Sequence, residues 1–280
     1  MAIETQIAVD PIAVTTPDLP GGWATTPRNE WLVILLWRIG IAVAVLGMWQ
    51  FASGRLIKPF WISSPLAIWD QLATWIETGE LWLHVEVTLT ETLLGFVFGA
   101  LSGVIVGLAL GLNRRLAAIL DPFIVGFYSL PKIALAPLFI LWFGVGLASK
   151  IVMATFVVFF LVFYNTYAGT LAVEQELVDV LRLMGASRRQ IIAKVILPSV
   201  VIWIFTGMKT SVPYALIGAV VGEMMASNKG LGYLIQAAAG QYDTGGVFAA
   251  LFVLSIIAML LHTVLKHGEN RLLRWKEDGL

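Results

Sequence analysis

The sequence places a few charged side chains inside long apolar stretches, where such groups usually serve a purpose. A cation at the centre of a bilayer costs roughly 2.5–3.5 kcal/mol on insertion scales. Lys132 and Lys209 are cations of this kind and could attract an anion. Arg38, in the first apolar stretch, fits a snorkelling or structural role better.

The two lysines also have a simpler interpretation. Each could snorkel to the membrane surface or pair with Glu223 or Glu91. If a path for a solute runs through the protein, we expect the residues that contact the solute to come from a small set of charged, soft and aromatic side chains. The set comprises Lys132, Lys209, Glu223, Met224 and Tyr128.

Residues for catalysis or metal binding are scarce. The chain has no cysteine, and His84, His262 and His267 are scattered along it. No phosphate-binding Gly-x-x-x-x-Gly-Lys-Ser/Thr sequence, His/Glu metal motif or nucleophile elbow is present. We therefore expect no catalytic residue, no metal site and no cofactor held by this chain.

Composition indicates the environment in which these residues work. Hydrophobic residues make up 59% of the chain and charged residues 13%, with a mean hydropathy of +0.86. A soluble domain usually carries about 25% charged residues, so this chain could not cover a water-facing surface. The lipid bilayer is therefore its expected surroundings. The formal net charge of +0 gives no reason to expect a nucleic-acid partner.

Apolar stretches of about 20 residues can span a bilayer as helices, and the sequence contains several. We expect an all-α membrane protein with six transmembrane helices, at Trp31–Phe51, Thr88–Leu112, Pro122–Phe143, Lys150–Leu171, Ser199–Gly222 and Val247–Lys266. The chain then divides into a disordered N-terminal tail, a first helix with an amphipathic segment, a transmembrane domain and a C-terminal tail. These are 1–30, 31–87, 88–268 and 269–280.

Basic residues in the loops predict the orientation. With the N-terminus inside, most of them fall on the cytoplasmic side, among them the pairs at 114–115 and 188–189. The outer segments would carry only Arg55, Lys58, Lys150 and Lys229. Both termini are therefore expected in the cytoplasm. Within the first outer segment, Pro65–Ile76 is amphipathic and could lie at the membrane surface or pack on the bundle.

The second expected span has a glycine at every fourth position, which puts the glycines on one helix face. Small residues at this spacing let two helix backbones approach closely. We interpret them as a packing surface and not as a ligand site. They are Gly95, Gly99, Gly103, Gly107 and Gly111.

The segment Ala172–Pro198 is polar, but its pattern is not that of a loop. Apolar residues recur at helical spacing up to Met184, and Gly185 then stands where a helix-ending glycine is expected. Ser187 and Gln190 form the pattern of a capping box that opens a second helix. The segment should form an elbow of two short helices. It could dock into a groove on a soluble partner or only pack under its own bundle.

The spacing of Asp179, Gly185, Val195, Leu197 and Pro198 resembles the cytoplasmic-loop signature of binding-protein-dependent ABC importer permeases. That signature is Glu-Ala-Ala, three residues, Gly, nine residues, Ile-x-Leu-Pro. This sequence departs from it, with Asp179 in place of Glu, Val-Leu in place of Ala-Ala and Val195 in place of Ile. The glycine, leucine and proline match at the right distances.

Further stretches resemble the nitrate/sulfonate/taurine/bicarbonate branch of these permeases. They are residues 84–111, 130–144, 149–151, 221–224 and 230–235. The resemblance extends over about Trp82 to Trp275. Glu91 stands where the branch more often has a basic residue, so it receives no role.

This resemblance implies a type I ABC importer permease (MetI-like) fold, in which the elbow is a coupling helix that fits a cleft of a separate cytoplasmic ATPase. Gly185 would make the turn, and Asp179 would anchor the first helix on the ATPase. The residues implied in coupling are Asp179, Gly185, Ala186, Leu197 and Pro198. ATP and Mg²⁺ would bind the ATPase and not this chain.

The other implied partners are a second permease copy, usually identical, and a periplasmic substrate-binding protein, in a bacterial inner membrane. The solute would be small and anionic, such as nitrate, bicarbonate, taurine, a sulfonate or an aromatic carboxylate, although a thiamine-precursor pyrimidine also fits the branch. A stand-alone secondary transporter or channel is the alternative. An intramembrane enzyme is a third interpretation, against which the missing motifs argue.

Overall fold

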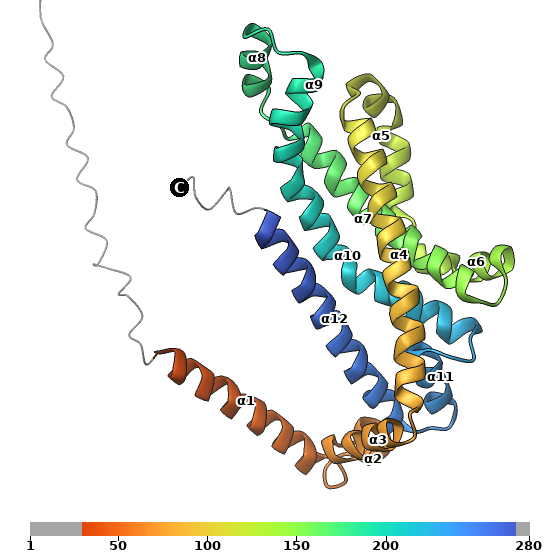
Figure 1. Ribbon diagram of the computed structural model, residues 1–280. Coiled ribbons are helices and arrows are strands. Elements are labelled where there is room, and N and C mark those ends of the chain that lie inside the picture. The colour runs from red at the N-terminus through yellow and green to blue at the C-terminus, as the bar shows by residue number, and fades with distance from the viewer. Residues whose placement is uncertain (1–29, 273–280) are drawn as a thin grey trace, which may run out of the picture. The chain divides into compact units, whose positions relative to one another are not determined.

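The computed structural model describes residues 30–272, and the chain is almost entirely helical over this range (Figure 1). The residues up to Phe51 and those from Ala52 onward form two separate units. The tail predicted at 1–30 lies outside the described residues except for Glu30, which opens α1. The tail predicted from residue 269 lies outside them beyond Leu272, where α12 ends.

The first unit consists of most of α1 (Glu30–Ala52), an apolar helix of 23 residues. Side chains such as Leu36 and Trp37 are exposed along it, which suits a helix surrounded by lipid. The second unit holds the remaining elements. They are α2 (Pro59–Ile62), α3 (Pro65–Glu77), α4 (Glu80–Gly111), α5 (Arg114–Ser129), η1 (Lys132–Leu135), α6 (Ala136–Phe143), α7 (Leu147–Leu171), α8 (Gln175–Leu183), α9 (Arg188–Ile191), η2 (Ile192–Ile196), α10 (Leu197–Ala226), α11 (Leu231–Gly240) and α12 (Thr244–Leu272).

Five helices of the described chain are long and apolar enough to cross a membrane, and a bent pair makes a sixth if it counts as one span. The pair is α5 with η1 and α6, which meet at 80°. Pro131 causes the break, because proline has no N–H to donate and forces the residue before it out of the helical region. Leu130 is accordingly extended, with φ −62° and ψ 137°. The expected all-helical membrane fold is confirmed, although the third expected span is not one straight helix.

The core of the second unit is the packing of α4, α7 and α10. All the glycines from Gly95 to Gly111 are buried, and each faces α7. A Cβ on Gly99 would lie 2.7 Å from the Thr155 carbonyl oxygen, closer than side chains can approach a backbone. Because these glycines have no side chains, the backbones of α4 and α7 can touch, which is how helices associate in lipid.

The amphipathic segment forms α3, which is capped by Ser64, whose hydroxyl accepts from the backbone N–H of Ala67 at 3.2 Å. Its buried side chains are Ile68, Leu72 and Trp75, and the helix packs on α12 and α4. Trp69 and Ile76 remain exposed on the other side. The helix α3 therefore packs on the bundle with one side and presents an apolar surface outward with the other.

Candidate functional site

The elbow between α7 and α10 has the local structure that its sequence predicts. Gly185 adopts φ +80°, which only glycine reaches without strain. The Gly185 N–H donates to the Arg182 carbonyl at 3.0 Å, and the Ala186 N–H donates to the Leu181 carbonyl at 2.9 Å. This pair of bonds is the Schellman motif, which closes the end of α8.

The second arm of the elbow begins with a complete capping box. The Ser187 N–H donates to Gln190 Oε1 at 2.7 Å, and the Gln190 N–H donates back to Ser187 Oγ. From there α9 continues through a π-helical stretch, η2, into α10, with Pro198 in the first turn of α10. A movement of the elbow would therefore be transmitted along a continuous helical segment into a membrane span.

The elbow has an inner and an outer surface. Val178 and Ile191 are buried and line a groove together with Leu112, at the end of α4. On the outer surface lie the exposed apolar side chains Leu177, Val180, Leu183 and Met184. One side of the elbow thus packs under its own bundle, and the other carries an exposed apolar surface.

Asp179 and its neighbours lie on the exposed side of the elbow. The Asp179 carboxylate accepts from Arg182 Nη1 and from Gln175 Nε2, each at 3.0 Å. Both side chains of the ion pair are more than half exposed, so the pair adds little stability. It leaves the carboxylate at the surface, where a partner could reach it.

The structure brings Lys132 and Tyr128 together beside α7. Lys132 Nζ donates to the Tyr128 carbonyl at 2.6 Å and lies 4.8 Å from the centre of the Tyr128 ring and 5.3 Å from that of Phe160. Tyr164 stacks on Tyr128 with ring centres 4.8 Å apart. An ammonium group has three donors, so this aromatic cluster leaves Lys132 able to bind an anion.

Lys209 lies in a different setting. Its Nζ donates to both carboxylate oxygens of Glu269, at 2.8 and 2.7 Å. The pair joins the middle of α10 to the last turn of α12, and both side chains are partly buried. Sequence reasoning named Glu223 or Glu91 as the partner and missed Glu269, which it assigned to the C-terminal tail.

Glu223 lies in the protein interior and not on a surface. It is 1% exposed, and its carboxylate accepts from the Thr88 hydroxyl and from the Gly232 N–H, both at 2.6 Å. Glu91 is also 1% exposed and contacts Glu223, and Lys150 lies close to both carboxyl groups. Met224, the next residue, is exposed instead.

The residues named as path candidates therefore fall into separate groups on different elements. Tyr128 and Lys132 form one group, Lys209 belongs to another, and Glu223 belongs to a buried polar cluster. Sequence reasoning missed most of this cluster, namely His84, Thr88 and Lys150. The only available signal was that polar side chains stood inside apolar segments. Among residues 30–272 no three His, Cys, Asp or Glu side chains group as a metal site requires.

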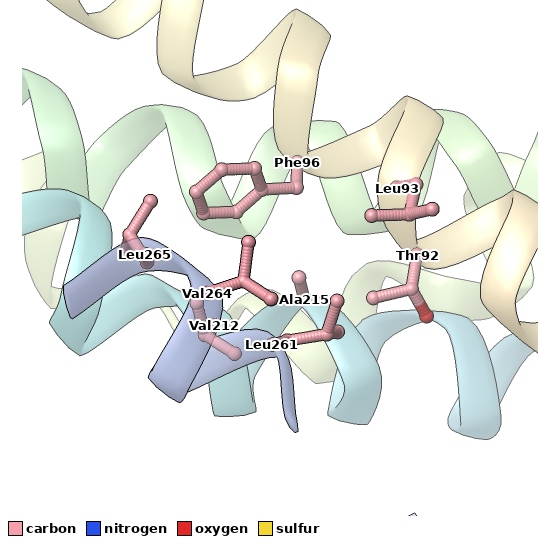
Figure 2. Close-up of a pocket in the computed structure, with 8 residues that line it drawn as sticks. All are labelled: Thr92, Leu93, Phe96, Val212, Ala215, Leu261, Val264 and Leu265. Carbon is pink, nitrogen blue, oxygen red and sulfur yellow. The ribbon is translucent and has the colours of Figure 1, made fainter. Parts of the chain in front are cut away.

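A cavity of about 100 Å³ lies between α4, α10 and α12 (Figure 2). Its eight lining residues are uncharged, and Thr92 is the one among them with a hydroxyl group. The other side chains that Figure 2 labels are aliphatic or aromatic. Such a lining suits hydrocarbon and offers a polar solute a single hydroxyl group.

Comparison with known proteins identifies the family. The model of the family described as "Binding-protein-dependent transport system inner membrane component" matches residues 95–274, more than half of the chain. The chain belongs to this family. It is accordingly a permease subunit of an ATP-binding-cassette importer.

Similar permeases come from several bacteria. A formylaminopyrimidine transport permease of Halalkalibacterium halodurans is 32% identical over 82% of this chain and 92% of its own length. A putative aliphatic sulfonates transport permease of Bacillus subtilis is 32% identical over 90% of each chain. The taurine transport system permease of Escherichia coli is 32% identical over 84% of this chain and 87% of its own length.

The fold of the permease also matches solved structures. An inward-facing methionine ABC transporter chain aligns with a TM-score of 0.59 at 23% identity, over 70% of this chain and 97% of its own length. This likeness confirms the type I importer permease fold that the sequence resemblance implied.

Proposed function

We propose that this permease forms, with a second copy of itself, the path by which a small anionic solute enters a bacterial cell across the inner membrane. A separate cytoplasmic ATPase would supply the energy by pushing on the elbow, and a periplasmic binding protein would deliver the solute. ATP and Mg²⁺ would bind only to the ATPase.

The outer surface of the elbow is the observation that carries the proposal. A connection between two spans needs no Schellman motif, no capping box and no exposed apolar row. Leu183 and Met184 are 89% and 76% exposed, although they lie at the end of the molecule expected in the aqueous cytoplasm. An amphipathic helix with such a row fits a groove on a soluble partner. The coupling residues Asp179, Gly185, Ala186, Leu197 and Pro198 would act here.

Lys132 is the strongest candidate for contact with an anion. Lys209 already holds Glu269, and Glu223 is buried, so a solute could reach either only after a rearrangement. Lys132 is partly exposed in an aromatic cluster instead. Some relatives are named for sulfonates, which are anions, and another for a pyrimidine. These names support a small solute, and Lys132 favours an anionic one.

A path between two copies of the chain is favoured over a path within one copy. The cavity among α4, α10 and α12 is apolar, and Lys132 and Tyr128 lie at the surface of the chain. A second copy could cover them and complete the path. An identical copy is the simplest partner, because a two-fold symmetric pair places the same surface of each copy against the other.

The chain contains no cysteine, so single cysteines can be introduced to test the elbow. Met184→Cys, on the elbow, should cross-link to a cytoplasmic ATPase in native membranes. Leu141→Cys is the matched control, because Leu141 is 78% exposed on α6 and should not cross-link. Uptake by the reconstituted complex should require ATP. Failure of every elbow cysteine to reach an ATPase, together with ATP-independent transport by the purified chain, would favour a stand-alone transporter or channel.

A further inference from the structure

The start of α11 is held by side chains from other helices. The first N–H groups of a helix have no partner within it. At the start of α11 the N–H of Gly230, just before the helix, donates to His84 Nδ1 at 2.9 Å, the Leu231 N–H donates to Thr88 Oγ1 at 2.8 Å, and the Gly232 N–H donates to Glu223 Oε2. We call these three bonds the α11 clamp.

The acceptors of the α11 clamp lie deep in the protein. His84, Thr88 and Glu223 are 4%, 0% and 1% exposed. His84 and Thr88 are one turn apart on α4, and Glu223 belongs to α10. The clamp therefore ties α11 to both spans. It leaves no room for a side chain at Gly230, because a Cβ there would collide with the Glu223 carboxyl group.

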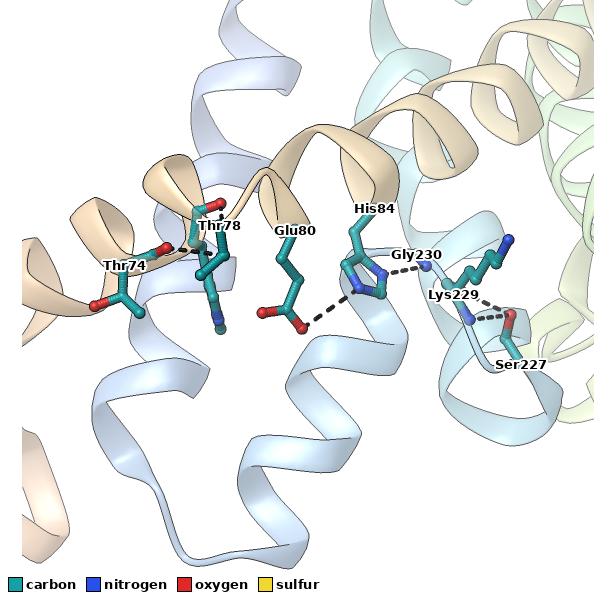
Figure 3. Close-up of polar contacts among 8 residues, drawn as sticks. Thr74, Thr78, Glu80, His84, Ser227, Lys229 and Gly230 are labelled. Carbon is teal, nitrogen blue, oxygen red and sulfur yellow. Dashed lines mark hydrogen bonds and ion pairs between the residues drawn. The ribbon is translucent and has the colours of Figure 1, made fainter.

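His84 and Glu223 are the members of the clamp that can titrate, and His84 is the one that has no acceptor left once it takes up a proton. Its Nδ1 accepts a hydrogen bond from Gly230, so this nitrogen carries no proton and the ring is neutral. The proton is then on Nε2, which lies 3.8 Å from Glu80 Oε1 (Figure 3). A second proton would place a ring N–H directly against the Gly230 N–H and break that bond.

A carboxylate that could pair with a protonated His84 ring lies close to it. Glu80, one turn earlier on α4, would pair with the protonated ring, whereas burial of the ring and, more weakly, Lys229 in the turn before α11 oppose its charge. Tyr233 of α11 stacks on the ring at 5.7 Å between centres. The neutral ring thus bonds to the turn before α11, and the protonated ring would bond to its own helix.

We propose that His84 is a pH-sensitive latch that holds α11 onto α4 when neutral and releases it when protonated. The bond to Gly230 is present at high pH and is lost as the pH falls. This proposal depends on the proposed function only for the side of the membrane on which His84 lies. His84 lies at the end of α4 opposite the elbow, which that orientation places toward the outside. Acid outside the cell would then loosen the connection between α10 and α12.

A distance measurement across the clamp can test this proposal. Spin labels are attached to cysteines replacing Trp82, exposed on α4, and Gln236, exposed on α11, in the full-length chain with its co-purified subunits in lipid. Between about pH 8 and about pH 5, where histidine titrates, we expect the distribution of distances to lengthen and broaden. In His84→Asn the amide oxygen can still accept from Gly230 but does not titrate, so the change should disappear.

Two further variants make the result decisive. His267→Asn removes an exposed histidine on α12, and the response to pH should remain. Glu80→Gln removes the partner of the protonated ring without touching the buried groups, so release should need more acid. No response in the wild-type chain, or an unchanged response in His84→Asn, would overturn the latch. Neither result depends on ATP-driven uptake, so failure of the proposed function would be seen separately.

Discussion

At the scale of single residues, the glycines of α4 show how spacing alone can predict a contact. Gly99 faces the Thr155 carbonyl and Val158 of α7, and a Cβ would lie 2.7 Å from both. Gly99→Ala must push α4 away from α7, so we expect a loss of about 1–3 kcal/mol of stability, as for other overpacked cores. Thermal unfolding of the purified permease in detergent or lipid measures this loss.

Gly126 provides the matched control for that change. It lies within α5, and a Cβ there would have no neighbour within 4 Å. Gly126→Ala should be neutral or should stabilise the helix by roughly 0.5–1 kcal/mol, because alanine is the better helix former. Equal effects at the two positions would mean that the contact between α4 and α7 does not depend on small residues.

The buried polar residues were harder to predict than the glycines. Glu91 and Glu223 stood out as charges in apolar segments, but nothing local showed that they contact each other. Lys150 was expected at the outer end of a span and counted with the outer basic residues, yet its side chain is 4% exposed within α7. Contacts between residues so far apart in sequence depend on how α4, α7 and α10 pack. Periodicity within one helix carries no such information.

At the scale of elements, the elbow could be predicted because its signals are local. Gly185 ends α8 with φ +80°, and no atom outside its immediate chain neighbours would contact a Cβ there. Gly185→Val should therefore act through backbone strain alone, at a cost of about 1–2 kcal/mol. We expect ATP hydrolysis to continue but uptake to fall several-fold, as measured in proteoliposomes, because the elbow would change its angle.

Asparagine tests whether that effect comes from the backbone. It adopts positive φ more readily than other residues with a side chain, so Gly185→Asn should keep most of the uptake. If valine and asparagine are equally harmful, contact with the partner and not the turn would be responsible.

Prediction was weaker for α5 to α6, where Pro131 indicated a break but nothing gave its angle. It was also weaker for α4, which begins at Glu80 and not at Thr88.

At the scale of the whole molecule, the second unit itself indicates whether the bent pair of α5 and α6 crosses the membrane. The groove under the elbow is lined by Leu112 together with Val178 and Ile191, so the end of α4 and the elbow lie at the same end of this unit. In Figure 1, α3 and α11 lie at the opposite end. Because α7 crosses once between these ends, the bent pair of α5 and α6 must also cross.

The crossing of the bent pair predicts which positions lie on the same side of the membrane. Val145, in the turn between α6 and α7, is 74% exposed, and Leu183, on the elbow, is 89% exposed. In intact cells, a membrane-impermeant thiol reagent should label Val145→Cys and Glu77→Cys but should reach Leu183→Cys only after permeabilisation. If the bent pair returned without crossing, Val145 would lie on the same side of the membrane as the end of α4. The elbow would then lie on the opposite side of the membrane. Labelling of Leu183→Cys in intact cells, with Val145→Cys protected, would support that re-entrant path. An elbow outside the cell could not reach a cytoplasmic ATPase, so the same experiment tests both the crossing and the proposed coupling.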